Sequence, residues 1–187
     1  MDFLYTIDLS IFYFINKTLA NPVFDKVLVL LRTQECWFIA YAILIYFLAT
    51  KFKTPGRLLI LTIALAIIFS DQFNSHFLKE LVGRIRPCHS LPDVRLLVPC
   101  GGGKSFPSSH AVNNFTLAVI LAYFFPQYKY HFYTLATLIV FSQVYVGVHY
   151  PADVLAGTLL GFAIGNLFVL IHKKLILKMF KITDKPK

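Results

Sequence analysis

Long apolar segments alternate with short polar ones along most of the chain. Five of these segments carry few charges, and each approaches the roughly 20 residues that a helix needs to cross the hydrocarbon core of a bilayer. They are Gln34–Thr50, Arg57–Val82, Ser109–Phe125, His131–Val148 and Ala152–Lys173. Prolines at or near their ends are typical of helix boundaries. The pattern therefore predicts an all-α fold, an integral membrane helical bundle with five or six transmembrane helices.

The N-terminal part of the chain is apolar but less regular. Phe3–Asn16 is short for a span and contains Asp8, so the pattern favours a helix at the membrane interface over a sixth span. The chain start has no basic region and does not resemble a cleaved signal peptide. We expect a single membrane domain over residues 1–187. Its parts are an interfacial or re-entrant segment (1–33), a transmembrane core (34–173) and a basic cytoplasmic tail (174–187).

Composition and charge agree with a membrane protein. Hydrophobic residues make up 57% of the chain, and 18 Lys and Arg stand against 9 Asp and Glu. In so apolar a chain, excess positive charge indicates topology signals and contact with anionic headgroups, not nucleic acid. The positive-inside rule puts the basic turn Lys51–Arg57 and the lysine-rich tail in the cytoplasm. The loops Gly83–Ser108 and Gly147–Pro151 then both face outward.

Polar side chains gather at the outward ends of the predicted spans. A charge near the centre of a span costs about 2.5–3.5 kcal/mol, so such residues are candidates for function. Taken singly, each has an ordinary explanation, such as a snorkelling lysine or a capping serine. Together on one membrane face they indicate a site. The set is Lys79, Arg86, Ser108, Ser109, His110, Ser142, Gln143, His149 and Asp153.

The chemistry of this set fits a phosphate group. Lys79 offers a point charge and Arg86 a fork of donors for phosphate oxygens. A helix that starts at Ser108–His110 presents free backbone N–H groups, which also bind anions. The sequence GGGKS lacks the first glycine of a P-loop, because that position is Val98.

Two histidines complete a scheme for phosphate transfer. His149 is a candidate nucleophile if Asp153 accepts the proton of its other ring nitrogen. His110 is then free to protonate the leaving oxygen. These loops lack three histidine or cysteine ligands at metal-binding spacing, so the sequence predicts neither a metal nor another cofactor.

Three motifs in this region resemble those of the type 2 phosphatidic acid phosphatase superfamily of membrane lipid phosphatases. They are KELVGRIRP (Lys79–Pro87), PSSH (Pro107–His110) and SQVYVGVHYPAD (Ser142–Asp153). The resemblance implies a metal-independent phosphatase with a phosphohistidine intermediate, in which His149 attacks phosphorus, Asp153 orients it and His110 protonates the leaving group. It also implies a phosphate-binding set, which is Lys79, Arg86, Ser108, Ser109, Ser142 and Gln143.

The third motif departs from the family at one charged position. Gln143 stands where the family has arginine, and Ser109 takes the place of a glycine in the second motif. Glutamine keeps donors but loses the charge that would stabilise the transition state. Arg84 and Lys104 are candidates to replace that charge, and we expect Gln143→Arg to raise the rate of phosphate release.

The resemblance also suggests the substrate and the location. It favours a phosphorylated lipid, above all lipid A 1-phosphate, at the periplasmic face of a bacterial inner membrane. The alternatives within the family are undecaprenyl diphosphate, phosphatidylglycerophosphate and phosphatidate. A non-catalytic lipid-phosphate binder or transporter is an alternative of another class. The oligomeric state stays open.

Cys88 and Cys100 lie in the same predicted outward loop. An oxidising periplasm would permit a disulfide between them, and two free thiols are the other possibility.

Overall fold

The computed structural model describes residues 3–176, and within them the chain is helical without strands. The helices are α1 (Phe3–Tyr13), α2 (Pro22–Arg32), α3 (Phe38–Lys51), α4 (Lys53–Gln72), α5 (Lys79–Val82), α6 (Pro87–Ser90), α7 (Ser109–Phe124), α8 (Lys129–Tyr145) and α9 (Pro151–Ile171). A π-helical segment, Phe73–Leu78, joins α4 to α5. The all-α prediction is confirmed. Most of the predicted tail, from residue 177 onward, lies outside the described residues.

Helix lengths differ from the predicted spans. Lys53–Ser90 and Pro151–Lys174 are long and apolar enough to cross a membrane, and the pair Pro22–Arg32 and Gln34–Lys51, bent by 67°, is a third candidate. The first predicted span begins at Gln34 as expected, with a 3₁₀ turn over Gln34–Trp37 that continues into α3, and the bend lies just before it. The second begins earlier, at Lys53, since proline is tolerated in the first turn of a helix.

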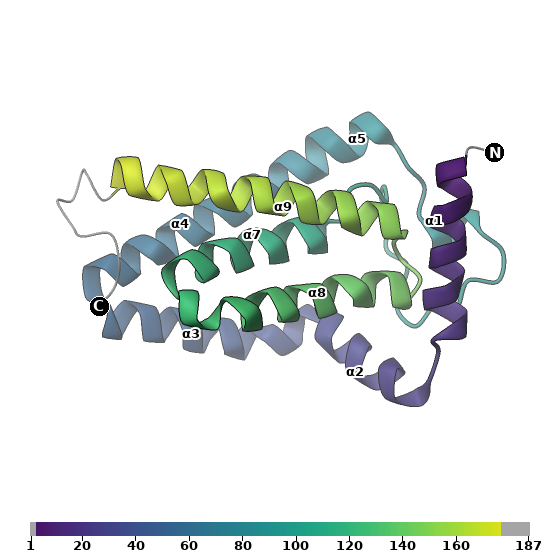
Figure 1. Cartoon of the computed structure of the whole chain (residues 1–187), viewed down its shortest axis with the longest axis horizontal. Helices are drawn as coiled ribbons and strands as arrows, with labels where there is room; N and C mark the ends of the chain where they lie inside the picture. The colour runs from purple at the N-terminus through teal and green to yellow at the C-terminus, as the bar shows by residue number, and fades with distance from the viewer. Residues whose placement is uncertain (1–2, 177–187) are drawn as a thin grey trace.

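The long helices lie side by side, and α1 runs across one end of the bundle (Figure 1). The connections 83–108 and 147–150 are at that same end, as the alternation of spans predicted. Two backbone hydrogen bonds join the first connection to residues that flank the second: Ser108 N–H donates to the Asp153 carbonyl at 3.1 Å, and Leu97 N–H to the Val146 carbonyl at 3.3 Å.

A glycine face brings α7 and α9 unusually close. A Cβ atom at Gly157 would lie 2.7 Å from the Ser108 carbonyl oxygen, and one at Gly161 would lie 2.6 Å from the Val112 carbonyl oxygen. Small residues at four-residue spacing permit such approach between membrane helices. The close contact fixes the start of α9 against the start of α7, where the candidate site residues lie.

The N-terminal segment is tied to the same end of the bundle. Asn16 is fully buried, and its side-chain amide donates to the carbonyls of Arg95 and Tyr145, each at 2.8 Å. Asp8 accepts a hydrogen bond from the Ala152 N–H at 2.8 Å. Because these bonds fix α1 against the start of α9, the N-terminal segment supports the site.

Candidate active site

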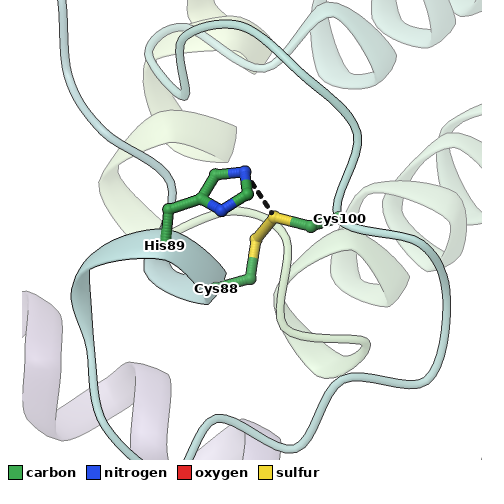
Figure 2. A group of neighbouring side chains, drawn as sticks. All are labelled: Cys88, His89 and Cys100. Atoms are coloured by element: carbon green, nitrogen blue, oxygen red, sulfur yellow. Dashed lines mark hydrogen bonds between the residues drawn. A yellow bond between two sulfur atoms is a disulfide. The ribbon is translucent and has the colours of Figure 1, made fainter.

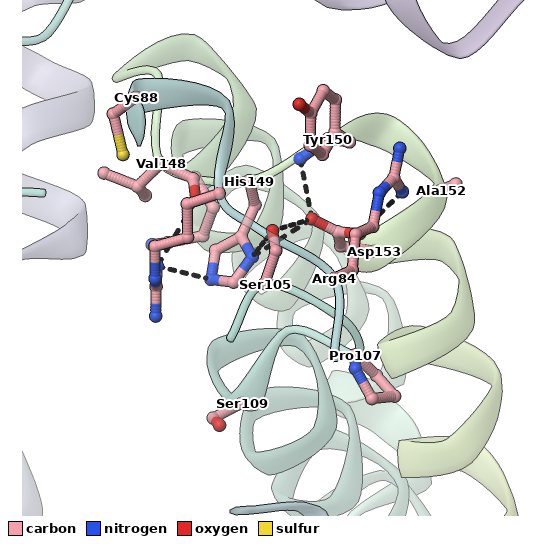
Figure 3. Close-up of polar contacts among 12 residues, drawn as sticks. Arg84, Cys88, Ser105, Pro107, Ser109, Val148, His149, Tyr150, Ala152 and Asp153 are labelled. Carbon is pink, nitrogen blue, oxygen red and sulfur yellow. Dashed lines mark hydrogen bonds and ion pairs between the residues drawn. The ribbon is translucent and has the colours of Figure 1, made fainter. Parts of the chain in front are cut away.

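His149 and Asp153 form the centre of the candidate site, one turn apart at the entry to α9. Nδ1 of His149 lies 3.4 Å from Oδ2 of Asp153, and both side chains are buried. Ser105 lies beside the pair, as Figure 3 shows: its hydroxyl donates to Oδ2 of Asp153 and is 3.4 Å from Nδ1 of His149. Sequence reasoning missed Ser105, although it stands two residues before the second motif.

The carboxylate of Asp153 is held from both sides. The Tyr150 N–H donates to Oδ2 at 2.8 Å, and Arg84 Nη1 donates to Oδ1 at 2.8 Å. Arg84 also pairs with Asp8 at 2.5 Å and stacks over the Tyr150 ring, 3.8 Å from its centroid. Two carboxylates, those of Asp8 and Asp153, thus hold the Arg84 guanidinium. Arg84 therefore orients Asp153 and is not available to replace the charge missing at position 143.

The other ring nitrogen of His149 faces Arg86. Arg86 Nη1 lies 3.3 Å from Nε2 of His149 and donates to the Val148 carbonyl at 3.3 Å. A guanidinium only donates, so this contact and the carboxylate at Nδ1 together favour the tautomer with the proton on Nδ1. Burial lowers the pKa of His149 to about 4, against the opposing effect of Asp153. The imidazole is thus neutral at pH 7, with its Nε2 lone pair directed toward Arg86.

Lys79 and His110 converge on the same place. Lys79, Arg86 and His149 all lie within electrostatic range of His110. Helix α5 ends at Val82, where Gly83 adopts a left-handed conformation with φ of 66°. Arg86 therefore reaches the site from an extended loop and not from the continuation of the helix that carries Lys79.

Two polar atoms of the predicted phosphate-binding set are buried without a protein partner in the described chain. They are Nε of Arg86 and Oγ of Ser108. Leaving a buried polar group unpaired costs about 1–3 kcal/mol, so each such atom calls for an explanation. A bound anion would satisfy both.

The other predicted phosphate ligands have partners inside the protein. Ser109 accepts a hydrogen bond from Asn74 at 2.9 Å, and Ser142 donates to the Ile139 carbonyl at 2.6 Å. Gln143 is fully buried and accepts from Arg32 Nε at 3.3 Å. Each of these three side chains thus has a partner within the protein, and Gln143 brings in Arg32, which lies outside the three motifs.

A cavity of about 520 Å³ opens beside His110 and runs between α3, α4 and α7. His110, Asn113 and Arg32 line its polar end, and its remaining walls are mainly apolar, with Leu44, Leu48 and Ile63 among them. The cavity touches His110 but not His149. Apolar material attached to a bound phosphate would therefore extend from the His110 side.

The loop 83–108 is closed by a disulfide between Cys88 and Cys100, so the bridge is formed and the free-thiol alternative is not (Figure 2). His89 Nε2 lies 3.2 Å from the Cys100 sulfur. The loop thus gathers three side chains with ligand atoms within 4.8 Å of one another, a grouping that sequence reasoning did not foresee. Metals bind cysteine as thiolate, and these sulfurs are bonded to each other.

The chain belongs to the PAP2 superfamily, whose model matches residues 55–177. It is accordingly an integral-membrane lipid phosphatase. A lipid A 4′-phosphatase of Bacteroides thetaiotaomicron is 32% identical over 100% of this chain and 86% of its own length. A lipid A 1-phosphatase of Rhizobium johnstonii is 30% identical over 68% of this chain and 59% of its own length. The transmembrane PAP2-type phosphatidylglycerolphosphate phosphatase from Bacillus subtilis shares the fold, with a TM-score of 0.71 and 25% identity over 94% of this chain and 89% of that structure.

Proposed function

We propose that residues 1–187 act as one membrane domain that removes a phosphate from lipid A through a phosphohistidine on His149. The observation that carries the proposal is the arrangement of His149, whose Nε2 lies 3.3 Å from Nη1 of Arg86 while Nδ1 faces Asp153. Nε of the same guanidinium is buried without a protein partner in the described chain. That arrangement suits a nucleophile whose charge after attack is stabilised by a carboxylate.

The reaction follows from the two histidines. The Nε2 lone pair of His149 forms a bond to phosphorus, and the bond from phosphorus to the lipid oxygen breaks. His110, in its protonated form, gives its proton to the departing oxygen. The oxygen of a water molecule then bonds to phosphorus as the water loses a proton to His110, and the bond from phosphorus to Nε2 of His149 breaks, which releases phosphate and restores the imidazole. Lys79, Arg86 and the Ser108 hydroxyl hold the phosphate oxygens, which gain charge during transfer.

The cavity supports a lipid leaving group. In phosphoryl transfer the attacking and leaving atoms lie roughly in line across phosphorus. Since His149 attacks from one side, the leaving group departs on the other, where the cavity meets His110. The apolar walls of α3 and α4 then accommodate acyl chains.

The position on lipid A has two candidates. The sequence motifs favour the 1-phosphate, as in the Rhizobium relative, while the similarity over the whole chain to the Bacteroides protein favours the 4′-phosphate. We also propose that the site faces the periplasm from the inner membrane. The disulfide between Cys88 and Cys100 supports this, because such bonds persist in oxidising compartments.

The test is phosphate release from purified protein in detergent micelles. The substrates are bisphosphorylated lipid A, undecaprenyl diphosphate, phosphatidylglycerophosphate and phosphatidate. We expect the highest kcat/KM on lipid A, with mass spectrometry of the product identifying the phosphate removed. Faster turnover of any other lipid would contradict the proposed substrate, and release from none would contradict the proposed function.

A further inference from the structure

Arg32 is a cation of the candidate site that lies outside all three sequence motifs. It is the last residue of α2, is half-buried and lines the cavity beside His110. Its Nε donates to Oε1 of Gln143 at 3.3 Å. Within residues 3–176, nothing accepts a hydrogen bond from its two terminal nitrogens. The guanidinium is therefore held through Nε, and its two terminal nitrogens are free to donate to a ligand.

The position of Arg32 follows from how α2 is anchored. Asp25 of α2 accepts a hydrogen bond from the Tyr145 hydroxyl at 2.6 Å and pairs with Arg95. Immediately after α2 the chain bends by 67°, and Trp37 Nε1 closes the bend by donating to the Leu31 carbonyl at 2.8 Å. These contacts fix the C-terminal end of α2 against α8, and they thereby hold Arg32 in place beside the site.

The charges around Arg32 leave room for an anion. In the described part of the chain, the main charge acting on Arg32 is the like charge of Arg86. Arg32 also acts electrostatically on His110. The half-buried guanidiniums of Arg32 and Arg86 repel each other unless an anion lies between them. A phosphate bound at His149 and His110 would supply that anion.

We propose that Arg32 is a phosphate-binding residue of this enzyme and that Gln143 is the positioning residue that holds it. The inference rests on the proposed function for its substrate and names a further ligand of that same site. Gln143 acts through its carbonyl oxygen, which fixes Nε of Arg32 and leaves the terminal nitrogens free for two phosphate oxygens. The cation comes from α2, 111 residues before the glutamine that orients it.

This arrangement changes what an arginine at position 143 would do. An arginine at position 143 would place a second guanidinium beside that of Arg32. Because a guanidinium only donates, the hydrogen bond from Arg32 Nε would be lost, and two like charges would be buried together. We therefore expect Gln143→Arg alone to lower the rate, contrary to the expectation from sequence. In the Arg32→Gln background the same change restores a cation and should recover activity.

Orthovanadate is the first probe, since it is a phosphate-like anion whose binding does not require turnover. Its affinity is measured by the rise in Tm of the full-length protein in detergent. We expect Arg32→Gln to weaken binding by about 10- to 100-fold, the effect of losing hydrogen bonds to a charged group. Lys26→Gln removes an exposed charge from the same helix and should bind as the wild type does. Wild-type affinity in Arg32→Gln would overturn the inference.

Arg32→Lys covers the case in which Arg32→Gln does not fold. Lysine keeps the charge but not the fork, so we expect several-fold weaker binding, and unchanged affinity would again overturn the inference.

A double-mutant cycle separates positioning from a purely structural role. If Gln143 acts through Arg32, Gln143→Leu raises KM in the wild-type background and adds little to Arg32→Gln. Fully additive losses would contradict the positioning role. The two proposals also fail differently: vanadate binding without phosphate release from any lipid would sink the proposed function alone, whereas full lipid turnover by Arg32→Gln would sink this inference alone.

Discussion

Nδ1 of His149 lies 3.4 Å from Oδ2 of Asp153, and that oxygen also accepts hydrogen bonds from the Ser105 hydroxyl and the Tyr150 N–H. The carboxylate is thus fixed by three donors around one atom, with Arg84 bound to its other oxygen. A carboxylate held in this way fixes the tautomer of the imidazole and stabilises the charge that develops on it.

Asp153→Asn should lower kcat by on the order of 10³- to 10⁴-fold, as loss of a tautomer-fixing carboxylate does in other enzymes. Binding of vanadate should fall far less, because Asp153 touches His149 and not the anion. Steady-state kinetics and vanadate titration measure the two effects. A loss confined to KM would show that Asp153 has another role.

Ser105→Ala tests the residue that sequence reasoning missed. It removes one of the donors to Oδ2 of Asp153 and leaves the others in place. Hydrogen bonds to charged groups contribute about 1.5–3 kcal/mol, so we expect a loss of roughly 10- to 100-fold in kcat. Ser10→Ala is the matched control for folding and expression, because it removes an exposed hydroxyl that donates to the Thr6 carbonyl within α1. Full activity in Ser105→Ala would remove this serine from the account.

The pH dependence should report the neutral state of His149. Attack requires an unprotonated Nε2, so the rate falls as pH drops through the pKa of this group. That pKa is lowered to about 4 by burial, from an ordinary value of 6.5. We therefore expect kcat/KM to fall on the acid side with a midpoint near pH 4. Substrate ionisation also affects this profile, so its contribution is measured by ³¹P NMR and removed. An acid-side limb near pH 6.5 would contradict a buried, neutral His149, whereas a fall on the alkaline side would report the proton that His110 donates.

Chelation tests the metal-independent mechanism. We expect dialysis against EDTA to change phosphate release by no more than about twofold, since histidine chemistry needs no Lewis acid. The comparison is the same enzyme with magnesium or zinc added back. Loss of activity that either ion restores would point to metal-assisted hydrolysis.

The glycine face between α7 and α9 should be sensitive to a single methyl group. A Cβ at Gly161 would lie 2.6 Å from the Val112 carbonyl oxygen, so Gly161→Ala must push the two helices apart. Overpacking of this kind costs about 1–3 kcal/mol and should lower Tm in detergent. Gly102→Ala is the control, because a Cβ there would meet nothing within 4 Å. Equal Tm values for the two variants would show that α7 and α9 separate without cost.

The sequence predicted the parts of the site that depend on alternation and spacing. Alternating spans place the loops that carry Arg86 and His149 at the same end of the bundle, and His149 and Asp153 are four residues apart, one helical turn. These relations follow from helix geometry alone.

Other parts of the site depend on tertiary contacts with no local signal. Ser105 is one polar residue within a glycine- and serine-rich loop, and only the fold brings its hydroxyl to Asp153. Arg32 reaches Gln143 because the chain bends by 67° after α2. Arg84 was a candidate to replace the charge at position 143, but the carboxylates of Asp8 and Asp153 bind it. The partners in these contacts are far apart in the sequence, so no local pattern indicates that they meet.

The covalent intermediate is the central claim, and trapping it tests the account most directly. Lipid A labelled with ³²P is mixed with enzyme, and the reaction is stopped in alkali, where phosphohistidine survives. We predict label on the wild-type protein that maps by peptide analysis to His149, and none on His149→Gln. Steady turnover of lipid A without a labelled protein, or label on another residue, would contradict the account.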